Sequence, residues 1–586
     1  MKLGIDFGSA YSTISRYDSE NGRAVALTLK EGDPASIPSS VAISKKGTVS
    51  CGLIARSKAG LVDLYEAFKM FLVESDSELL RRNGFDEDKT PEYISTLFLQ
   101  YVLSGVVKKY ADIGEDIEQI VICVPEVWRN NIRSIDGCNI LSKILKQNIK
   151  LPDERKIKAV RVVTEPEAAS AFFAHNYELT TKKAFNGHLL LIDYGGGTLD
   201  LTLMEISSDG TKTMEIGFRE SGGIGENHPD ENGKYIIGHA GFSYIRRVVE
   251  LAILESDDSI DVDELDFESK QFKSAEHQLE DLLKDPSNMS EIEYNFGMFG
   301  RYEDFEEILD EDDIEFNEFT FMGEEITVTY QQLYRAYRDT IEKTLNDQLV
   351  EMNEKVRERI GIDPCSYESG TNDDFKIALV GGFCSFYLVR KQIESIYNFD
   401  SNTENDKRIK NINSDKSEQA IALGAGLIAS GRVILQKTAR YSIGLYTTDH
   451  EGRKHLKYGI RWHQMIEPEK PYYLLFSNDH GDTDSNRLKY AALKNHIENF
   501  VVEFSSNEKK GFRLKLKQNM IQRLANIPDG GLWCCGFSMD QNDVISFHVT
   551  PAPGSPAIYK GIKIALDSYS NMFEMTSGEE VYDDEI

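Results

Sequence analysis

The sequence predicts an α/β domain built from two similar halves, followed by a smaller β-rich domain. A strand, an aspartate, a glycine turn and a second strand occur twice, in KLGIDFGSAYSTIS from Lys2 and in LLLIDYGGGTLDLTLME from Leu189. Apolar runs alternate with helical patterns up to about residue 430, whereas short alternating segments follow from Tyr441. Because 586 residues exceed one ordinary core, we expect two or more domains.

The elements of the first domain follow from two periodicities. Strands buried on both faces read as nearly continuous apolar runs, which occur at Ile120–Val124, Val160–Val163, Leu189–Ile192 and Lys376–Val380. Apolar residues at helical spacing predict helices over 386–396 and 421–428, and an exposed amphipathic helix over 330–360. After the triple glycine, Asp200 and Thr202 alternate with leucines, which predicts a strand with one buried and one polar face.

Changes of pattern place the domain boundaries. We expect the first domain over 1–432, with an acidic insertion-like subdomain at about 226–325 whose charge runs form solvated faces. An interdomain linker at 433–440 precedes a β-rich domain at 441–556, in which Phe512–Leu516 alternates as a half-buried strand. Residues 557–586 are expected to form a C-terminal segment that ends in a disordered acidic tail, EEVYDDEI.

Composition excludes several classes of partner. The net charge of −31 argues against nucleic acid, whose backbone needs clustered Lys and Arg. No apolar run approaches the roughly 20 residues of a membrane span, and the N-terminus does not resemble a secretory signal. The seven cysteines form no CxxC pairs and do not cluster with histidines, which favours reduced thiols over a metal site. We therefore expect a cytoplasmic protein without a membrane or nucleic-acid partner.

The two glycine hairpins are suited to holding phosphates. Glycine lets backbone N–H groups approach phosphate oxygens, and hydroxyl residues add donors; the first turn has Gly8 and Ser9, and the second has Gly195, Gly196, Gly197 and Thr198. Asp6 and Asp193 each end a strand at the turn, where they would hold hydrated Mg²⁺ from opposite sides, and Asp200 would orient a water. A single glycine turn more often only links strands, but two matching hairpins favour phosphate binding.

A third turn supports the first two. IALVGGFCSFYLVR runs from a buried strand through Gly381 and Gly382 into a helix, whose N-terminus would face a nucleotide. The chain has no GxxxxGK[ST] loop, and the triple glycine enters a strand rather than a helix, which excludes a dinucleotide fingerprint.

These motifs together resemble the actin-like ATPase fold, with its duplicated ribonuclease-H-like halves in two lobes, and more narrowly the DnaK-type seventy-kilodalton heat-shock chaperone family. GIDFGSAYS resembles the first phosphate motif of that family, LIDYGGGTLDLTLM the second, and IALVGGFCSFYLVRKQIE the adenosine motif. Three further segments match in chain order: IPSSVAI, VPEVWRNNIR with Pro125 and Arg133, and VTEPEAASAFF. The resemblance covers roughly residues 1–430.

The resemblance implies roles for particular residues. Asp6 and Asp193 would bracket Mg²⁺ through water, Glu165 and Asp200 would place the attacking water, and Lys69 would stabilise charge on the γ-phosphate. The alternative for Lys69 is an ordinary surface lysine on an amphipathic helix. The residues implied to contact ATP or ADP are Gly8, Ser9, Ala10, Tyr11, Gly195, Gly196, Gly197, Thr198, Gly222, Gly223, Glu276, Gly381, Gly382, Phe383 and Glu418.

The sequence also departs from the family pattern. Ser385 and Glu280 stand where the family stacks adenine between arginines, and Ala10 replaces a second hydroxyl. The linker carries Lys437 where an aspartate is expected, and the residues after 556 are too few for the family's helical lid. These departures affect nucleotide affinity and coupling to a J-domain co-chaperone.

The resemblance implies a lidless ATP-dependent chaperone-like protein with slow ATPase activity, in which nucleotide state controls binding of unfolded polypeptide or a dedicated partner. A J-domain co-chaperone and a nucleotide-exchange factor are implied as further partners. The alternative is a nucleotide-gated regulatory scaffold with one dedicated partner and weak or no ATPase activity. A small-molecule kinase of the same fold and a filament-forming actin relative are further alternatives.

Overall fold

The computed structural model describes most of the chain in ranges separated by gaps. These ranges are 1–58, 62–74, 77–126, 128, 135–208, 214–224, 228–229, 235–236, 240–256, 265–267, 269–366, 374–398, 419–439, 442–448, 454–461, 464–475, 487–489, 501–505, 512–516, 531–541, 545–557, 561–565 and 573–575. The chain forms two compact units, Met1–Leu435 and Gln436–Ile586, and each is described by itself.

The first large sheet contains the first glycine hairpin. Its strand order is β3-β2-β1-β8-β9, and β4 pairs with β2. The strands are β1 (Lys2–Phe7), β2 (Tyr11–Asp18), β3 (Arg23–Leu27), β4 (Ser36–Pro38), β8 (Gln119–Val124) and β9 (Val160–Thr164). β1 and β2 are antiparallel, while β8 lies parallel to β1, so the turn after β1 lies at the same edge as the carboxyl end of β8.

The second large sheet repeats this arrangement around the triple glycine. Its order is β17-β10-β11-β12-β18, with β10 and β11 antiparallel and β17 parallel to β10. The strands are β10 (Gly187–Tyr194), β11 (Leu199–Ser208), β12 (Met214–Ile224), β17 (Phe375–Val380) and β18 (Val433–Leu435). The expected strands at 189–192 and 376–380 are therefore confirmed, as are those at 120–124 and 160–163 in the first sheet.

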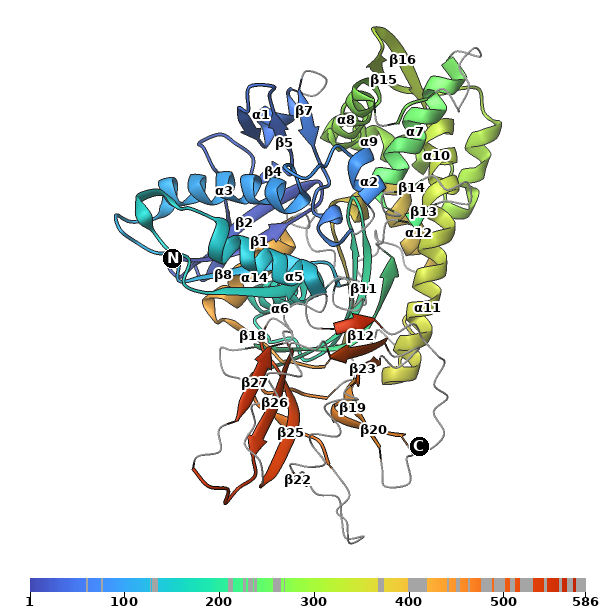
Figure 1. Ribbon diagram of the computed structural model, residues 1–586. Coiled ribbons are helices and arrows are strands. Elements are labelled where there is room, and N and C mark those ends of the chain that lie inside the picture. The colour runs from blue at the N-terminus through green and yellow to red at the C-terminus, as the bar shows by residue number, and fades with distance from the viewer. Residues whose placement is uncertain are drawn as a thin grey trace. The chain divides into compact units, whose positions relative to one another are not determined.

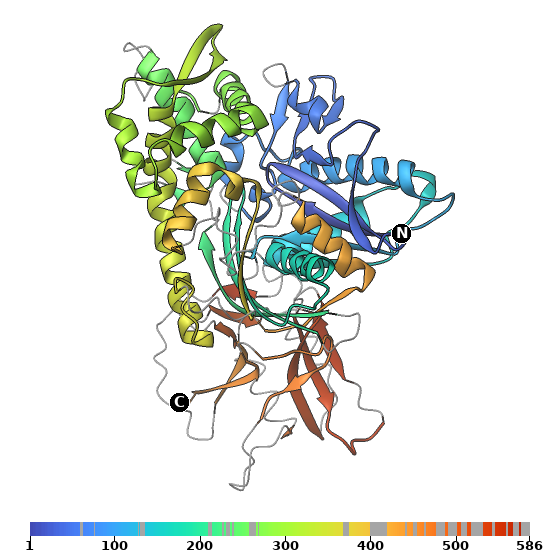
Figure 2. The same cartoon turned by 180° about the vertical axis from the view of Figure 1, so that it is seen from behind.

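Two helices, α6 (Glu165–Thr181) and α14 (Ala420–Ser430), join the two sheets. They share one apolar cluster with Val121 and Val163 of the first sheet and with Leu189 and Leu191 of the second. The opposite face of β10, with Leu190 and Ile192, belongs to a separate cluster. Because successive side chains of a strand point to opposite faces, β10 is buried on both faces from Leu189 to Tyr194. Figures 1 and 2 show α6 and α14 beside the strands of this unit.

The remaining elements of the first unit include several helices and three small sheets, β6-β5-β7, β13-β14 and β15-β16. On the first half these are β5 (Val41–Ile43), β6 (Val49–Cys51), β7 (Asp63–Tyr65), α1 (Leu53–Arg56), α2 (Ser77–Arg82), α3 (Pro91–Tyr110) and α5 (Ile135–Lys143). On the second half they are α7 (Gly241–Ser256), α8 (Lys270–Lys284), α9 (Pro286–Gly297), α10 (Tyr330–Tyr337), α11 (Lys343–Ile360), α12 (Tyr387–Ile396) and the strands β13 (His228–Pro229), β14 (Tyr235–Ile236), β15 (Glu315–Phe321) and β16 (Glu324–Thr329).

Two sequence expectations about this unit were wrong about exposure. The segment 330–360 is helical as expected, with a π-helical turn, Arg338–Glu342, between α10 and α11, but it is not exposed throughout, because the α10 side chains of Tyr330, Leu333, Tyr334 and Tyr337 are buried. The tyrosines pack their rings into the core, which the charged neighbours in the sequence conceal. The strand after the triple glycine, β11, is also buried on both faces from Leu199 to Met204, so the polar side chains of Asp200 and Thr202 are buried as well.

The described elements of the second unit are strands. They form two sheets, β20-β19-β23-β24-β28 and β21-β25-β26-β27, with β22 paired to β25. Their bounds are β19 (Ser442–Thr448), β20 (Lys454–Ile460), β21 (Tyr472–Tyr473), β22 (Leu488–Lys489), β23 (Val501–Ser505), β24 (Phe512–Leu516), β25 (Leu532–Met539), β26 (Ile545–Pro551), β27 (Ile562–Ala565) and β28 (Phe573–Met575). Pairing continues past the expected domain end at residue 556, because β27 joins β26 and β28 joins β24.

No helix within the described ranges combines the length and apolar character that a bilayer crossing requires. All seven cysteines lie outside disulfides, and all but Cys365 are buried. The tail from residue 576, expected to be acidic and disordered, lies outside the described residues.

The junction made by α6 and α14 depends on glycine. A Cβ at Gly424 would lie 1.7 Å from the Ala168 carbonyl oxygen, and one at Gly4 would lie 2.2 Å from the Gly426 nitrogen. We predict that Gly424→Ala destabilises the first unit by about 1–3 kcal/mol, because the α6 and α14 backbones must separate. Thermal unfolding followed by circular dichroism measures the change.

Gly297→Ala is the matched control, since the added methyl would contact only the Tyr387 hydroxyl at 3.5 Å. It should be neutral or slightly stabilising because alanine favours a helix over glycine. Equal unfolding temperatures for Gly424→Ala and wild type would contradict the close backbone contact.

Candidate functional site

Three aspartates lie at the glycine turns of the two large sheets. Asp6 is the penultimate residue of β1, and Asp193 occupies the same place in β10. Asp200 of β11 pairs directly with Asp193 across the antiparallel ladder. All three are buried, with exposed fractions of 8%, 4% and 0%. The sequence expectation that these carboxylates belong to two matching turns is consistent with this register.

Lys69 and Glu165 form a buried ion pair next to these aspartates. The Lys69 side chain is 2% exposed and its Nζ donates a hydrogen bond to Glu165 Oε1. Lys69 precedes a 3₁₀ turn, Met70–Val73, so the alternative of a surface lysine on an amphipathic helix is wrong. Its ammonium also lies 6.0 Å from the centre of the buried Trp128 ring. Sequence reasoning did not find Trp128 because no local pattern connects it to Lys69.

The position of Glu165 is fixed by the start of α6. Thr164 ends β9 and caps the helix: its hydroxyl accepts from the Glu167 N–H, and the Glu167 carboxylate accepts from the Thr164 N–H at 2.9 Å. This capping box satisfies two N–H groups that a helix start leaves without partners. Glu165 is therefore the first helical residue after a buried strand, which holds its carboxylate at the end of the sheet.

The cluster is electrostatically unbalanced. Burial, together with the charge of Glu165, raises the pKa of Asp6 to about 7, although Lys69 opposes the shift. Burial and the neighbouring Glu165 and Asp200 carboxylates raise the pKa of Asp193 well above its usual range. One ammonium thus faces four carboxylates, and Asp193 Oδ2 has no hydrogen-bond partner among the described residues. A bound cation would relieve both the charge excess and the unpartnered oxygen.

The triple-glycine turn exposes its backbone at a place where side chains do not fit. The Gly195 N–H donates to the Thr198 carbonyl oxygen at 3.0 Å, which closes the turn. A Cβ at Gly196 would lie 3.1 Å from the Phe242 ring, and one at Gly197 would lie 3.1 Å from Met70 Sδ. Since Met70 follows Lys69, this contact brings the second turn to the lysine of the first half.

The third turn approaches Asp193 closely. Gly381 has φ +82°, and a Cβ there would lie 2.6 Å from Asp193 Oδ1. The chain then forms a 3₁₀ turn, Gly382–Ser385, before α12 begins. The expectation that the glycines lead directly into a helix is therefore wrong. Phe383 packs its ring against Tyr194 with the ring centres 5.1 Å apart. The Ser385 hydroxyl donates to the Gly382 carbonyl oxygen at 2.6 Å and so remains within its own turn.

The other residues implied to contact nucleotide are dispersed. In the first turn, Gly8 accepts a hydrogen bond from Ser39 at 2.7 Å, while Ser9 and Ala10 are half-buried. Gly223 of β12 pairs with Asp200, next to Gly222. Glu276 is instead paired with Arg246 at 2.9 Å. Glu418 and Arg133 lie outside the described residues.

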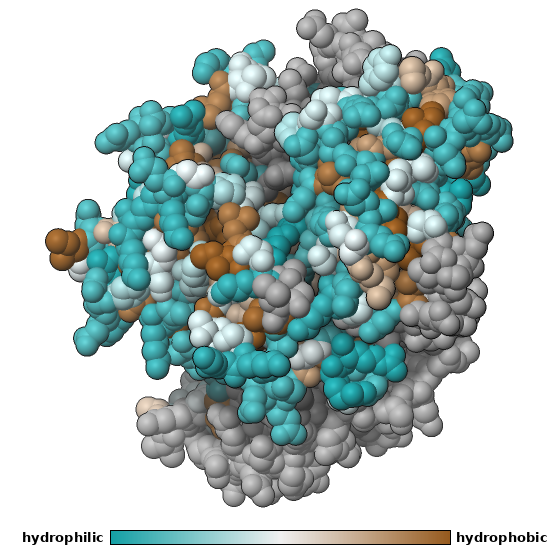
Figure 3. Space-filling model, turned by 90° about the horizontal axis from the view of Figure 1, so that it is seen from above, coloured by the Kyte–Doolittle hydropathy of each residue, from teal (hydrophilic) through white to brown (hydrophobic). Residues whose placement is uncertain are grey.

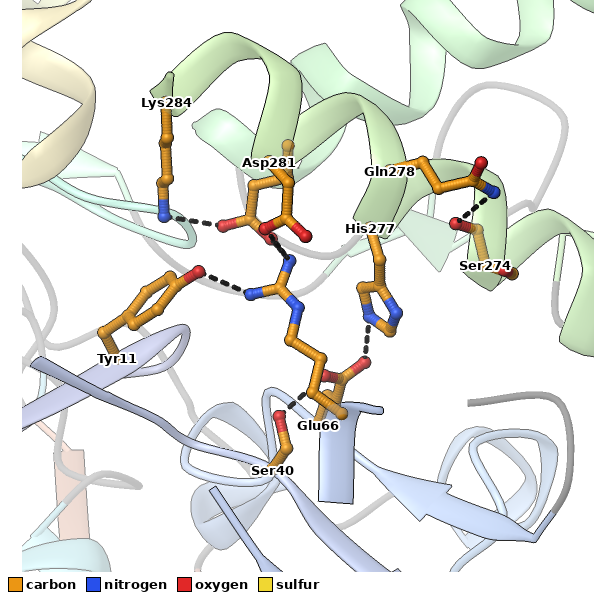
Figure 4. Close-up of polar contacts among 10 residues, drawn as sticks. Tyr11, Ser40, Glu66, Ser274, His277, Gln278, Asp281 and Lys284 are labelled. Atoms are coloured by element: carbon orange, nitrogen blue, oxygen red, sulfur yellow. Dashed lines mark hydrogen bonds and ion pairs between the residues drawn. The ribbon is translucent and has the colours of Figure 1, made fainter. Parts of the chain in front are cut away.

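A second set of charges joins the first half to helix α8, and Figure 4 shows it. Arg56 of α1 donates to the Tyr11 hydroxyl and to Glu280 of α8, the latter at 2.7 Å. His277 bonds to Glu66, which follows β7. Sequence reasoning placed Tyr11 and Glu280 at a nucleotide but missed Arg56, Glu66 and His277. Arg56 lies 224 positions from Glu280, and Glu66 lies 211 positions from His277, so no local signal identifies these contacts.

Metal coordination by the chain alone is not supported. Within the described ranges, no three His, Cys, Asp or Glu side chains form a group that could hold a metal ion. Mg²⁺ differs from most bound metals because it keeps several waters and takes only one or two carboxylates.

Two glycine turns around a buried cluster of acids and one lysine define a mixed α/β protein with a candidate phosphate site. No protein-family model matches the chain. The chaperone protein DnaK of Elusimicrobium minutum is 32% identical over 221 residues, which are 36% of this chain and 30% of that protein. The DnaK of Metamycoplasma hominis is 29% identical over 229 residues, covering 39% of this chain and 32% of the relative. The DnaK of Nitrosopumilus maritimus is 29% identical over 221 residues, which cover 35% of this chain and 29% of that protein.

These matches support a DnaK-like family for this chain, as the motifs predicted. The mixed α/β architecture fits the ATPase fold of that family. The chain spans about a third of the length of the curated relatives it matches.

The charge excess predicts an unusual dependence of stability on pH. A carboxyl whose pKa is raised on folding stabilises the fold below its unfolded value, and this stability is lost as pH rises through the folded pKa, here from about 4 to about 7. The stability of Asp6→Asn relative to wild type should therefore be greater at pH 8 than at pH 5, by about 1–3 kcal/mol. Thermal unfolding in chelator and without nucleotide tests this.

The exposed Asp313→Asn variant controls for the loss of one negative charge. It should leave the unfolding temperature unchanged at both pH values. A lower stability of Asp6→Asn at pH 8 would mean that the ionised carboxylate is net favourable in the empty site.

Proposed function

We propose that the Met1–Leu435 unit binds and slowly hydrolyses Mg-ATP, and that nucleotide state controls polypeptide or partner binding by the Gln436–Ile586 unit. The observation that carries this proposal is the buried cluster of Asp6, Lys69, Glu165 and Asp193 between two matching glycine turns. In this proposal the two sheets form two lobes that grip the phosphates from opposite sides.

The chain's own groups fit a magnesium-bound phosphate. Asp6 and Asp193 would hold the hydrated ion, since Asp193 Oδ2 is buried without a partner in the described structure. The turn N–H groups at Gly8, Gly196 and Gly197 would donate to phosphate oxygens. An added Cβ would lie 2.0 Å from the Tyr11 carbonyl oxygen at Gly8 and 3.1 Å from a neighbouring side chain at Gly196 and at Gly197, so glycine keeps the backbone of these turns open to a ligand. The bound ion supplies charge neutralisation of the phosphates, which allows the acidic cluster to accept an anionic ligand.

The remaining residues would serve the chemical step. Lys69 would leave part of its contact with Glu165 and donate to the terminal phosphate, where its charge stabilises the transition state. Glu165 and Asp200 would accept hydrogen bonds from the attacking water and orient it. Trp128 limits the positions open to the Lys69 ammonium, because its ring closes one side of the buried amine.

The relatives supply the support for a role in protein folding. The matched proteins are named chaperone protein DnaK, and the matched part is about a third of each. For this chain we propose unfolded polypeptide or a dedicated protein as ligand of the second unit, with a J-domain co-chaperone and a nucleotide-exchange factor as further partners, in the cytoplasm.

A second candidate is a nucleotide-gated regulatory scaffold with weak or no ATPase activity. One observation favours it: the two residues that stand at the family's adenine-stacking positions have partners within the protein. The Ser385 hydroxyl bonds to its own turn, and Glu280 is paired with Arg56 and Lys284. Weaker contact with the base would leave a protein that senses nucleotide but converts little of it.

Single-turnover hydrolysis of labelled ATP with Mg²⁺ separates the candidates. Wild type should convert bound ATP slowly, and Asp193→Asn and Lys69→Ala should lower the rate by about a hundredfold, as for loss of one electrostatic contributor. Bound but unconverted ATP in wild type would favour the scaffold.

Lys146→Ala is the matched control, because this lysine is exposed on the first half. It should hydrolyse ATP as wild type does. If wild type retains no nucleotide, or if all variants convert it equally, the proposed site is wrong.

A further inference from the structure

Helix α8 has two chemically distinct faces. Phe272, Ala275, Leu279 and Leu283 are buried and belong to the apolar cluster of the second sheet. His277, Glu280 and Lys284 follow one another at spacings of three and four residues, so they lie on one other face. The first face anchors α8 to the second half, and the second face is polar throughout.

The polar face of α8 contacts the first half through charges. Arg56 bonds to Glu280 at 2.7 Å and lies 3.3 Å from Asp281, while Lys284 bonds to Glu280 at 2.8 Å. The Lys284 ammonium also lies 3.7 Å from the centre of the Tyr11 ring. Tyr11 opens β2 directly after the first glycine turn, so these charges connect α8 to that turn (Figure 4).

His277 makes the neighbouring contact to the first half. It bonds to Glu66, which also accepts a hydrogen bond from the Ser40 hydroxyl at 2.7 Å. Glu66 directly follows β7 and precedes the segment of Lys69. The His277 contact and the Lys69 contact therefore belong to one short stretch of the first half.

The two halves thus meet in two different ways. At α6 and α14 the junction is apolar and so close that glycine is needed. At α8 the named contacts are ion pairs and hydrogen bonds, and beside them a cavity of about 300 Å³ lies between β7 and Lys270 and Lys273. Among the coloured residues of the face in Figure 3, most are hydrophilic, and the hydrophobic ones lie in separate patches. Such a polar contact separates at far lower cost than an apolar one.

We propose that the contact of Arg56, Glu66 and Tyr11 with α8 is a proton-sensitive clasp that holds the two halves together over a bound nucleotide and sets its release rate. This inference rests on the proposed nucleotide site. The halves would move about the α6–α14 junction and part at α8, and loss of the His277 charge would loosen the clasp.

The charged groups around His277 fix the direction of the effect. They are Glu66 from the first half, Arg56 from α1, and Glu280 on α8 itself. Burial lowers the pKa of His277, but the bond to Glu66 and its charge outweigh burial, so the pKa is raised above 6.5. Burial opposes ionisation of Glu66, yet its bond to His277 lowers its pKa below 4.5. The clasp is therefore complete at about pH 6 and is lost as pH rises through the raised pKa of His277.

The test measures release of a fluorescent ADP analogue from the full chain at pH 6 and pH 8. Wild type should release it about three to ten times faster at pH 8, which corresponds to one half-buried ion pair. His277→Gln and Glu66→Gln should release it rapidly at both pH values. His188→Gln, at the opposite end of β10 from Asp193, should behave as wild type.

A second measurement does not need nucleotide. Spin labels on Lys46→Cys and Tyr294→Cys, both exposed positions, report the separation of the β5–β6 turn from α9; Cys365→Ser removes the one native thiol that is not buried. Electron paramagnetic resonance should show longer distances at pH 8 than at pH 6, and pH-independent distances in His277→Gln.

The two measurements separate the failure of this inference from that of the proposed function. A pH-dependent distance without any ADP binding would support the clasp and overturn the nucleotide site. The clasp would be overturned if neither the ADP release rate nor the label distance depended on pH. It would also be overturned if both depended on pH in His277→Gln as much as in wild type. The raised pKa of Asp6 favours tighter Mg²⁺ binding at higher pH, so it cannot produce faster release at pH 8.

Discussion

The burial of several carboxylates around one ammonium is the constraint on which the rest of the first unit depends. Lys69 pairs with Glu165, and burial together with the neighbouring carboxylates raises the pKa of both Asp6 and Asp193. Such a cluster is costly unless the fold holds it rigidly. The capped start of α6 and the ladder between β10 and β11 do so by attaching each charge to a buried element.

The structure therefore combines an electrostatically unfavourable cluster of buried carboxyl groups with ordinary apolar packing around it. Leu190 and Ile192 on one face of β10, and Leu189 and Leu191 on the other, fill two separate apolar clusters beside Asp193. The stability that these clusters contribute allows the fold to tolerate the charges. A site that is strained when empty gains more from a compensating ligand than a relaxed one does.

Much of this arrangement could be predicted from sequence, and the reason is locality. Asp6 and Asp193 each belong to a strand and a glycine turn within a dozen residues, so the residues that define their surroundings are close to them in sequence. Lys69 required a resemblance, because its partner Glu165 is 96 positions away. Arg56, His277 and Trp128 were missed since their roles arise only when distant segments meet. The burial of Tyr330 and Tyr334 in α10 was missed because aromatic rings next to charged residues satisfy an amphipathic pattern equally well.

The protonation of Asp6 near neutral pH has a consequence for calorimetry. A carboxyl with a pKa of about 7 carries a proton in about half of the molecules at that pH, and a cation that binds beside it must displace that proton into the buffer. The measured heat of binding then contains the ionisation enthalpy of the buffer. Titrations in phosphate and in Tris would give different apparent enthalpies for the same binding event. Their difference would give the number of protons released when the cation binds.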